Sequence, residues 1–231
     1  MKRTVSPLGH TRFSAIKGQL GAHISKEARG KNSAPSPKQN GSTANNKRPA
    51  AHLKQRTARP ISLKTKEIKE IRFYRANEKP YGAFSNRYGR NIVFEGRQFP
   101  TAEHAYQAGK PKRDEVREWI LDAPTPALLA MAAHGLYTWD IVPNWSEIKY
   151  DRMGAVLRAK FTQHEDLREL LLQTGEARLV EAGRVPNTVN RTWGEVGGKG
   201  LNILGQLLME LRTQLRTEHG QDRRTKKAVP A

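Results

Sequence analysis

The distribution of apolar positions along this chain of 231 residues changes near residue 68. Residues 1–65 place few large apolar side chains among Pro, Ser, Asn and Lys, as in KNSAPSPKQNGSTANNKRPAAHLKQRTARP. Such a segment cannot bury enough surface to offset the entropy lost on ordering, so we predict a disordered basic tail over residues 1–66. Beyond it, apolar residues recur at strand and helix periods. This predicts a folded domain over residues 67–216 and a basic tail over 217–231.

Short stretches near the start of the folded domain have the pattern of β structure. EIRFYRA, which begins at Glu70, alternates and is aromatic, which favours a strand. YGAFSNRYG, which begins at Tyr81, is typical of a turn-rich loop. NIVFEGRQF predicts a short hairpin that turns at Glu95 and Gly96. The β part of the domain is therefore expected to be small.

Most of the remaining pattern is helical, with recognisable start signals. Thr101 is placed as the N-cap of a helix over AEHAYQAGK, and DEVREWILDA continues as a helix. Thr125 and Pro126 supply an N-cap and a first-turn proline for ALLAMAAHG. The residues from Asn144 to Glu147 match a capping arrangement before IKYDRMGAVLRAKF.

The last two predicted helices are bounded by glycine. EDLRELLLQTG closes on Gly175, just past the C-cap. GGKGLNILGQLLMELRTQL is a glycine-rich turn followed by a helix, and one face of that helix holds Leu204, Leu207, Leu208, Leu211 and Leu215. Together these elements predict a mainly α fold of the α+β class, a compact helical domain with a small β-hairpin.

One predicted helix has a polar stripe of mixed chemistry. Glu103, Gln107 and Lys110 fall at i, i+4 and i+7, so a carboxylate, an amide and an amine share one face. Such a stripe is either a solvated surface or the wall of a site.

The formal net charge is +19, and the two ends of the chain hold most of it. Residues 1–66 contain 15 Lys/Arg and one acid, whereas residues 67–215 contain 21 Lys/Arg and 19 acids. Basic ends of this kind fit attraction to a polyanion, which makes nucleic acid a candidate partner. A solubilising tail that binds nothing is an equally good interpretation.

Composition excludes several kinds of chemistry. The chain has no cysteine, which rules out disulfides, thiolate nucleophiles and Cys-ligated zinc. The seven His residues form no HExxH motif and no pair on one helix face, and we predict no metal site and no cofactor. The longest apolar run, ALLAMAA at 127–133, is too short to span a bilayer, and no apolar signal segment follows Met1. We therefore expect a cytoplasmic protein without membrane contact, and the sequence leaves its oligomeric state open.

Four motifs follow one another along the folded domain: YGAFSN at 81–86, PTAEHAYQAGK at 100–110, NWSEIKYDRMGAVLRAKF at 144–161 and NRTWGEVGGKGLNILGQLLMELR at 190–212. In this combination the chain resembles the NADAR family, also called YbiA-like, over roughly residues 70–215. Members of that family are small, mainly helical N-glycosidases. The resemblance implies an N-glycosyl hydrolase that cleaves the bond between a ribose and a base.

The resemblance also implies catalytic residues. Glu103 matches the family's essential glutamate, Lys110 the lysine that follows it, and Lys149 the lysine after the tryptophan of the third motif. Bond cleavage needs a carboxylate that moves a proton or activates water, and an amine here can attack an opened ribose aldehyde as a Schiff-base nucleophile. Asn190 stands where the family has aspartate, so the role of that aspartate is lost or belongs to another group.

The substrate is expected to contact residues of the same motifs, namely Phe84, Ser85, Asn86, Arg87, Gln107, Trp145, Trp193, Gly194, Lys199 and Asn202. Trp145 and Trp193 would supply flat walls for a base or a ribose. Arg87 replaces an aromatic residue of the family pattern, which indicates either a shifted substrate whose phosphate Arg87 meets or an impaired enzyme. On this interpretation the polar stripe of Glu103 is the wall of a pocket.

Three functions remain open at this stage. The basic tails favour removal of ADP-ribose from ADP-ribosylated guanine in nucleic acid. The first alternative is cleavage of ribosylaminopyrimidine intermediates of riboflavin synthesis. The second alternative is a catalytically silent module that binds ADP-ribose or nucleic acid.

Overall fold

The computed structural model describes residues 69–227, and its side chains as far as residue 218. The predicted tail over residues 1–66 lies outside the described residues. The last helix runs to Lys227, so it continues into the stretch predicted as a C-terminal tail.

The described chain is mainly helical with four short strands, which confirms the predicted fold class. Its elements in chain order are β1 (Glu70–Phe73), η1 (Tyr81–Phe84), β2 (Ile92–Phe94), β3 (Arg97–Phe99), α2 (Ala102–Gln107), α3 (Asp114–Leu121), α4 (Pro126–His134), η2 (Thr138–Asp140), α5 (Trp145–Gln163), α6 (Glu165–Gln173), β4 (Arg178–Glu181), α7 (Thr188–Trp193) and α8 (Ile203–Lys227).

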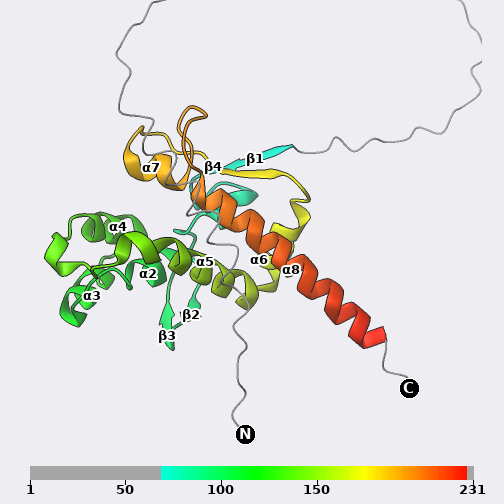
Figure 1. Cartoon of the computed structure of the whole chain (residues 1–231), viewed down its shortest axis with the longest axis horizontal. Coiled ribbons are helices and arrows are strands. Elements are labelled where there is room, and N and C mark those ends of the chain that lie inside the picture. Colours follow the sequence, from blue (N-terminus) through cyan, green and yellow to red (C-terminus); the bar gives the residue numbers. More distant parts are fainter. Residues whose placement is uncertain (1–68, 228–231) are drawn as a thin grey trace, which may run out of the picture. The chain divides into compact units, whose positions relative to one another are not determined.

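The strands form two separate pairs. β2 and β3 are antiparallel and turn through Glu95 and Gly96, both with positive φ, so the predicted hairpin is confirmed. β1 pairs in parallel with β4, in a register that sets Glu70 beside Arg178 (Figure 1). β4 was not among the predicted elements, and it joins the beginning of the domain to its last third.

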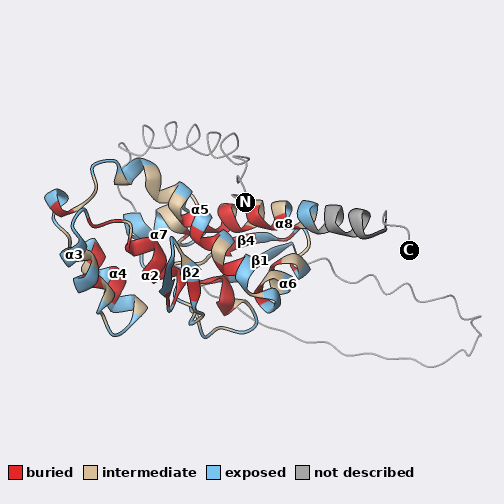
Figure 2. Ribbon diagram, turned by 90° about the horizontal axis from the view of Figure 1, so that it is seen from below, coloured by how far each residue is buried: buried red, intermediate tan, exposed pale blue. Residues whose placement is uncertain are grey.

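The core lies where α5 and α8 pack on each other and α8 covers β4. The predicted leucine face of α8 is buried along its whole length, and Val156, Leu157 and Phe161 of α5 have no exposed surface. Figure 2 shows this buried surface running through α2, α5, β4 and the first half of α8. A smaller cluster around Ile120 and Leu129 joins α3 to α4.

The helix caps follow the sequence signals in all but one case. Thr101 and Thr125 accept hydrogen bonds from the backbone N–H three residues on, as predicted. The capping arrangement predicted at Asn144 was wrong, because its side chain makes no cap bond at the start of α5. There the N–H of Trp145 donates to Val142 O at 3.1 Å, so the preceding turn leads directly into the helix.

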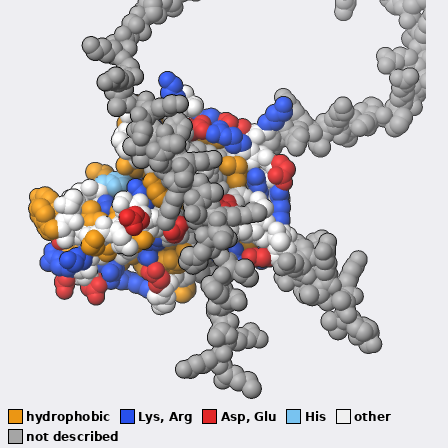
Figure 3. Space-filling view, viewed as in Figure 1, with side chains coloured by type: hydrophobic (Ala, Val, Ile, Leu, Met, Phe, Trp, Pro, Cys, Tyr) orange, Lys and Arg blue, Asp and Glu red, His pale blue; other side chains and the backbone are white. Residues whose placement is uncertain are grey.

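Acidic and basic side chains are interspersed over the face shown in Figure 3, with apolar side chains gathered at the end where α3 and α4 lie. No helix in the described part of the chain combines the length and apolar character needed to cross a bilayer.

Candidate active site

A cavity of about 490 Å³ lies among segments that are distant in sequence. Its walls come from the residues after β1, the residues after η1, and α2, α4, α5, β4 and α7. Nine of the residues that the sequence analysis singled out line this cavity: Ser85, Asn86, Arg87, Glu103, Gln107, Lys110, Trp145, Asn190 and Trp193. The fold therefore brings three of the four motifs, and the start of the fourth, to one place.

Glu103 faces this cavity from the first turn of α2 and is only 8% exposed. Its carboxylate accepts a hydrogen bond of 2.8 Å from Gln107 Nε2, and its backbone N–H donates to Asn86 O. Burial raises the pKa of Glu103, while the Gln107 bond and the charge of Arg87 oppose that rise. The polar stripe is thus buried at the wall of a cavity.

Two amide oxygens beside Glu103 have no partner within the described part of the chain. They are Asn86 Oδ1 and Gln107 Oε1, and both belong to residues that line the cavity. The amide nitrogen of Asn86 lies 3.2 Å from Met153 Sδ, and that of Gln107 is used by Glu103. A buried acceptor that makes no hydrogen bond costs free energy. These two oxygens therefore suit a ligand with several hydroxyl or N–H donors.

Lys110 follows α2 and is buried beside the same cavity. Its Nζ donates to Ala133 O at 2.5 Å. Burial, followed by repulsion from Lys149, lowers the pKa of the Lys110 amine, which increases its neutral, nucleophilic fraction. Lys149 itself is not on the cavity wall, and its Nζ lies 4.8 Å from the centre of the Tyr150 ring.

The two predicted aromatic wall residues, Trp145 and Trp193, both pack against a third ring that was not predicted as a site residue. Tyr106 of α2 lies between Trp145 and Trp193, with ring centres 5.2 Å and 5.6 Å away. Trp193 also packs on Tyr150 at 5.6 Å. This cluster gives the cavity an apolar side suited to a planar base or a sugar ring.

The remaining predicted site residues lie outside the cavity lining. Phe84 is fully buried in the core between Phe73 and Phe161. Lys199 is exposed in a turn that starts at Val196.

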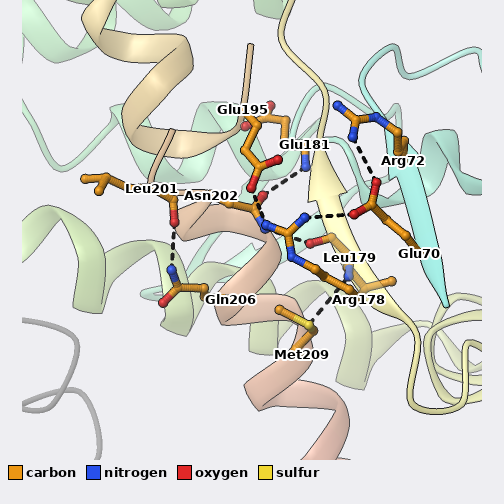
Figure 4. Close-up of polar contacts among 10 residues, drawn as sticks. All are labelled: Glu70, Arg72, Arg178, Leu179, Glu181, Glu195, Leu201, Asn202, Gln206 and Met209. Carbon is orange, nitrogen blue, oxygen red and sulfur yellow. Dashed lines mark hydrogen bonds and ion pairs between the residues drawn. The ribbon is translucent and has the colours of Figure 1, made fainter. Parts of the chain in front are cut away.

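Gly194 and Asn202 instead hold the end of β4. A side chain at Gly194 would collide with the carbonyl oxygen of Glu181. Asn202 accepts from the N–H of Glu181 at 3.0 Å and donates to Leu179 O at 2.8 Å (Figure 4). Both residues therefore act on the position of Glu181.

Asn190 lines the cavity from α7, and its amide is used to hold the adjoining loop. Its Nδ2 donates to Val185 O at 2.8 Å, and its backbone N–H donates to the side chain of Asn187, which caps α7. An aspartate could not make the first of these bonds, because an ionised carboxylate has no proton to donate.

Glu181 was missed by the sequence analysis, although it lines the cavity from the end of β4. Burial, followed by the negative charge of Glu103, raises the pKa of Glu181 to about 7, while Arg87 acts in the opposite direction. No local motif marks this residue. The signal that could have found it is its position at the end of RLVE, a short strand-like stretch, two residues before Gly183.

Lys160 was also missed, and it is completely buried under the segment that leads into the cavity. Its Nζ donates to Ala83 O at 2.5 Å and to Ser85 O at 3.0 Å. Burial lowers the pKa of Lys160 to about 7. A lysine within the apolar face of a predicted helix, as in VLRAKF, was the available signal. In the described part of the chain, no cluster of His, Asp and Glu could hold a metal ion.

The chain matches the NADAR domain model over residues 72–216. N-glycosidase YbiA of Shigella flexneri serotype 5b is 43% identical over 150 residues, which cover 64% of this chain and 89% of that protein. Riboflavin biosynthesis protein VVA0006 of Vibrio vulnificus is 33% identical over 150 residues, which cover 64% of this chain but 39% of that protein. The NMR structure of Escherichia coli YbiA aligns with a TM-score of 0.58 at 40% identity, over 66% of this chain and 88% of that one.

Proposed function

The chain belongs to the NADAR domain family and is an N-glycosyl hydrolase, and we propose that its substrate is ADP-ribosylated guanine in nucleic acid. The observation that supports this proposal is a cavity with an acidic wall and a basic rim. Glu103 and Glu181 lie on the wall, and Arg75 and Arg87 are exposed at the lining of the same cavity.

The acidic wall suits cleavage of an N-glycosidic bond. As the bond from ribose C1′ to the base nitrogen breaks, positive charge develops on the sugar ring, and a carboxylate beside it stabilises that charge or removes a proton from the attacking water. We assign this role to Glu103, which is buried and fixed by Gln107. The unpartnered oxygens of Asn86 and Gln107 would accept hydrogen bonds from ribose hydroxyls.

Lys110 lines the cavity, where its amine could act as the Schiff-base nucleophile inferred from the sequence. Its lowered pKa favours the neutral amine, which can form a Schiff base with the aldehyde of an opened ribose. Lys149 then acts through its charge, because it contributes to that lowered pKa without lining the cavity.

The basic rim suits a phosphate or a pyrophosphate. Within the described part of the chain, the guanidinium groups of Arg75 and Arg87 make no hydrogen bond or ion pair, so both are available to a ligand. Guanidinium groups bind phosphate oxygens in a bidentate manner. The excess of 41 Lys/Arg over 22 Asp/Glu extends this preference to a polyanion, which favours a base within nucleic acid over a free nucleotide.

A second candidate substrate is a ribosylaminopyrimidine intermediate of riboflavin synthesis. It is favoured by the relative that is named a riboflavin biosynthesis protein. Such a compound is smaller than an ADP-ribosylated base and would engage the same ribose-binding wall.

The test is to incubate the purified protein separately with ADP-ribosylated DNA and with ribosylaminopyrimidine phosphate. Release of ADP-ribose from the DNA is the expected result. Release of ribose 5-phosphate from the second compound alone would favour the riboflavin-type substrate. Tight binding of either compound without turnover would contradict a hydrolase and indicate a silent binding module.

A further inference from the structure

The backbone of Glu181 is fixed by hydrogen bonds on both its N–H and its carbonyl. Its N–H donates to Asn202 Oδ1 at 3.0 Å (Figure 4), and its carbonyl accepts from the N–H of Glu195 at 2.8 Å. Gly194 leaves room for this close approach because it has no side chain. These contacts use only the backbone of residue 181, so its side chain is left for the cavity that it lines.

The carboxyl group of Glu181 differs from that of its neighbour Glu195. Glu195 forms an ion pair with Arg178 on the other side of the strand pair. Glu181 has no hydrogen bond or ion pair through its side chain within the described part of the chain. The charged and titratable groups that line the cavity with it are Tyr74 and Arg75 after β1, Arg87 after η1, Glu103, Tyr106 and Lys110 on and after α2, and His134 at the end of α4.

Among these groups, Glu103 is the one whose negative charge acts on Glu181. Two carboxyl groups that line one cavity and act on each other do not both ionise at low cost, so one of them retains a proton near neutrality. Arg87 moderates this effect because its charge lowers the pKa of both. His134 does not supply a compensating positive charge, since burial, Lys110 and Arg87 all lower its pKa.

We propose that Glu103 and Glu181 form a carboxyl pair that holds one proton, with Glu181 as the general acid of the reaction and Glu103 as the base. This inference rests on the proposed N-glycosidase function. Glu181 gives its proton to the base nitrogen as the bond from C1′ to that nitrogen breaks. A water oxygen bonds to C1′, and Glu103 takes the proton that this water loses. The pair then again holds one proton, on the opposite partner, and a proton transfer between the two restores the starting state.

This assignment also accounts for Asn190. The position where the family has a carboxylate has an amide here, and that amide holds Val185. Asn190 packs close to Gly183, two residues beyond Glu181, so the two residues share one part of the cavity wall. Glu181 therefore supplies a carboxyl group where Asn190 supplies none.

The test compares Glu181→Gln with Glu103→Gln on two substrates. On an N-glycoside, both variants should be slower by about 10²-fold or more, because each lacks a proton-transferring group. On a 4-nitrophenyl riboside, whose leaving group departs without a proton, Glu181→Gln should stay within about threefold of the wild type while Glu103→Gln remains slow. Glu176→Gln, a change in an exposed side chain ahead of β4, is the control and should match the wild type on both.

The pH profile gives a second readout. The wild-type rate on the N-glycoside should fall as the pH rises through about 7, because Glu181 then loses the proton that it donates. Glu181→Gln should lack this alkaline limb. Equal loss on both substrates, or an unchanged alkaline limb, would overturn the role of Glu181.

Failure of the proposed function would look different. A wild-type protein that cleaves no N-glycoside refutes that function, and the carboxyl pair is then decided in the free protein by infrared titration of its carboxyl groups. One carboxyl should remain protonated near neutral pH in the wild type and should titrate at lower pH in either Gln variant. An unchanged titration in both variants would overturn the pair.

Discussion

Glu103 occupies a first-turn position where a glutamate ordinarily faces water and interacts with the helix dipole. Here the helix is only six residues long, and its N-terminal turn is buried against the segment that follows η1. The Glu103 N–H donates to Asn86 O, so the backbone of Glu103 is held against the end of the first motif. The pKa of the Glu103 carboxyl group is therefore determined more by its burial than by the helix dipole.

Replacing Glu103 by Gln tests that dependence. We expect Glu103→Gln to lower kcat on an N-glycoside by about 10²-fold or more, because a neutral amide cannot accept the proton that the attacking water loses. The thermal unfolding temperature should not fall, since removing a buried charge offsets the altered contact with Gln107. Retained activity together with a small loss of stability would mean that Glu103 is structural.

Lys160, which holds the segment that leads into the cavity, should make the free energy of unfolding depend on pH. Its pKa of about 7 lies below the ordinary lysine value of 10.5. Between these values the unfolded chain holds a proton that the folded chain has lost, so the free energy of unfolding should rise with pH across this window. We expect Lys160→Met to remove that rise, because methionine has no proton to lose, while the two buried carbonyls that lose their donor lower the free energy of unfolding equally at every pH.

Denaturant unfolding at several pH values between 7 and 10 measures this effect. Lys112→Met, a change in an exposed side chain, is the matched control and should keep the wild-type slope. A slope that survives in Lys160→Met would assign the pH dependence to another group.

At the scale of elements, local sequence signals were sufficient at two helix caps and at the hairpin turn, and they failed at the cap predicted for Asn144. Thr101, Thr125 and the pair Glu95-Gly96 were predicted correctly because their side chains or φ angles act on neighbours in sequence. β4 was missed because its four residues gain their hydrogen bonds from β1. Glu181 was missed with it, since its place in the cavity depends on that pairing and not on spacing.

The short helix α7 and the loop before it give a test of the missing family aspartate. Asn190→Asp would lose the bond to Val185 and would place a second negative charge beside Glu181. We expect a fall in kcat/KM of about tenfold, or 1.4 kcal/mol, because the anionic substrate is repelled and the loop loosens.

Asn187→Asp is the control for this change. It adds the same charge on the same helix but keeps an acceptor at the N-cap, outside the cavity lining. It should leave kcat/KM near the wild-type value. A tenfold gain in Asn190→Asp would show instead that this protein has simply lost activity at that position.

At the scale of the whole molecule, most of the net positive charge lies in a different part of the sequence from the residues that line the cavity. The central segment over 67–215 is nearly neutral, whereas residues 1–66 carry 15 Lys/Arg and one acid. A protein that begins at Thr65 should keep its rate on a small N-glycoside and bind DNA more weakly at low salt, with a shallower salt dependence. Fluorescence anisotropy of labelled DNA at several salt concentrations measures this affinity. Equal affinity of the full chain and the shortened protein would mean that the N-terminal residues do not bind DNA and act only as a spacer.

The parallel pairing of β1 with β4 also determines when the enzyme can first work. Glu70 and Arg178 are 108 positions apart, and Glu181 follows three residues later. A chain that leaves the ribosome N-terminus first cannot join Glu181 to Glu103 until nearly the whole domain has been made, and α8 must still follow to cover β4. Closing such a long loop is slow relative to helix formation. Nascent chains that already contain Glu103, Lys110 and Trp145 but end before Glu181 should therefore be inactive, and activity should arise in one late step of synthesis.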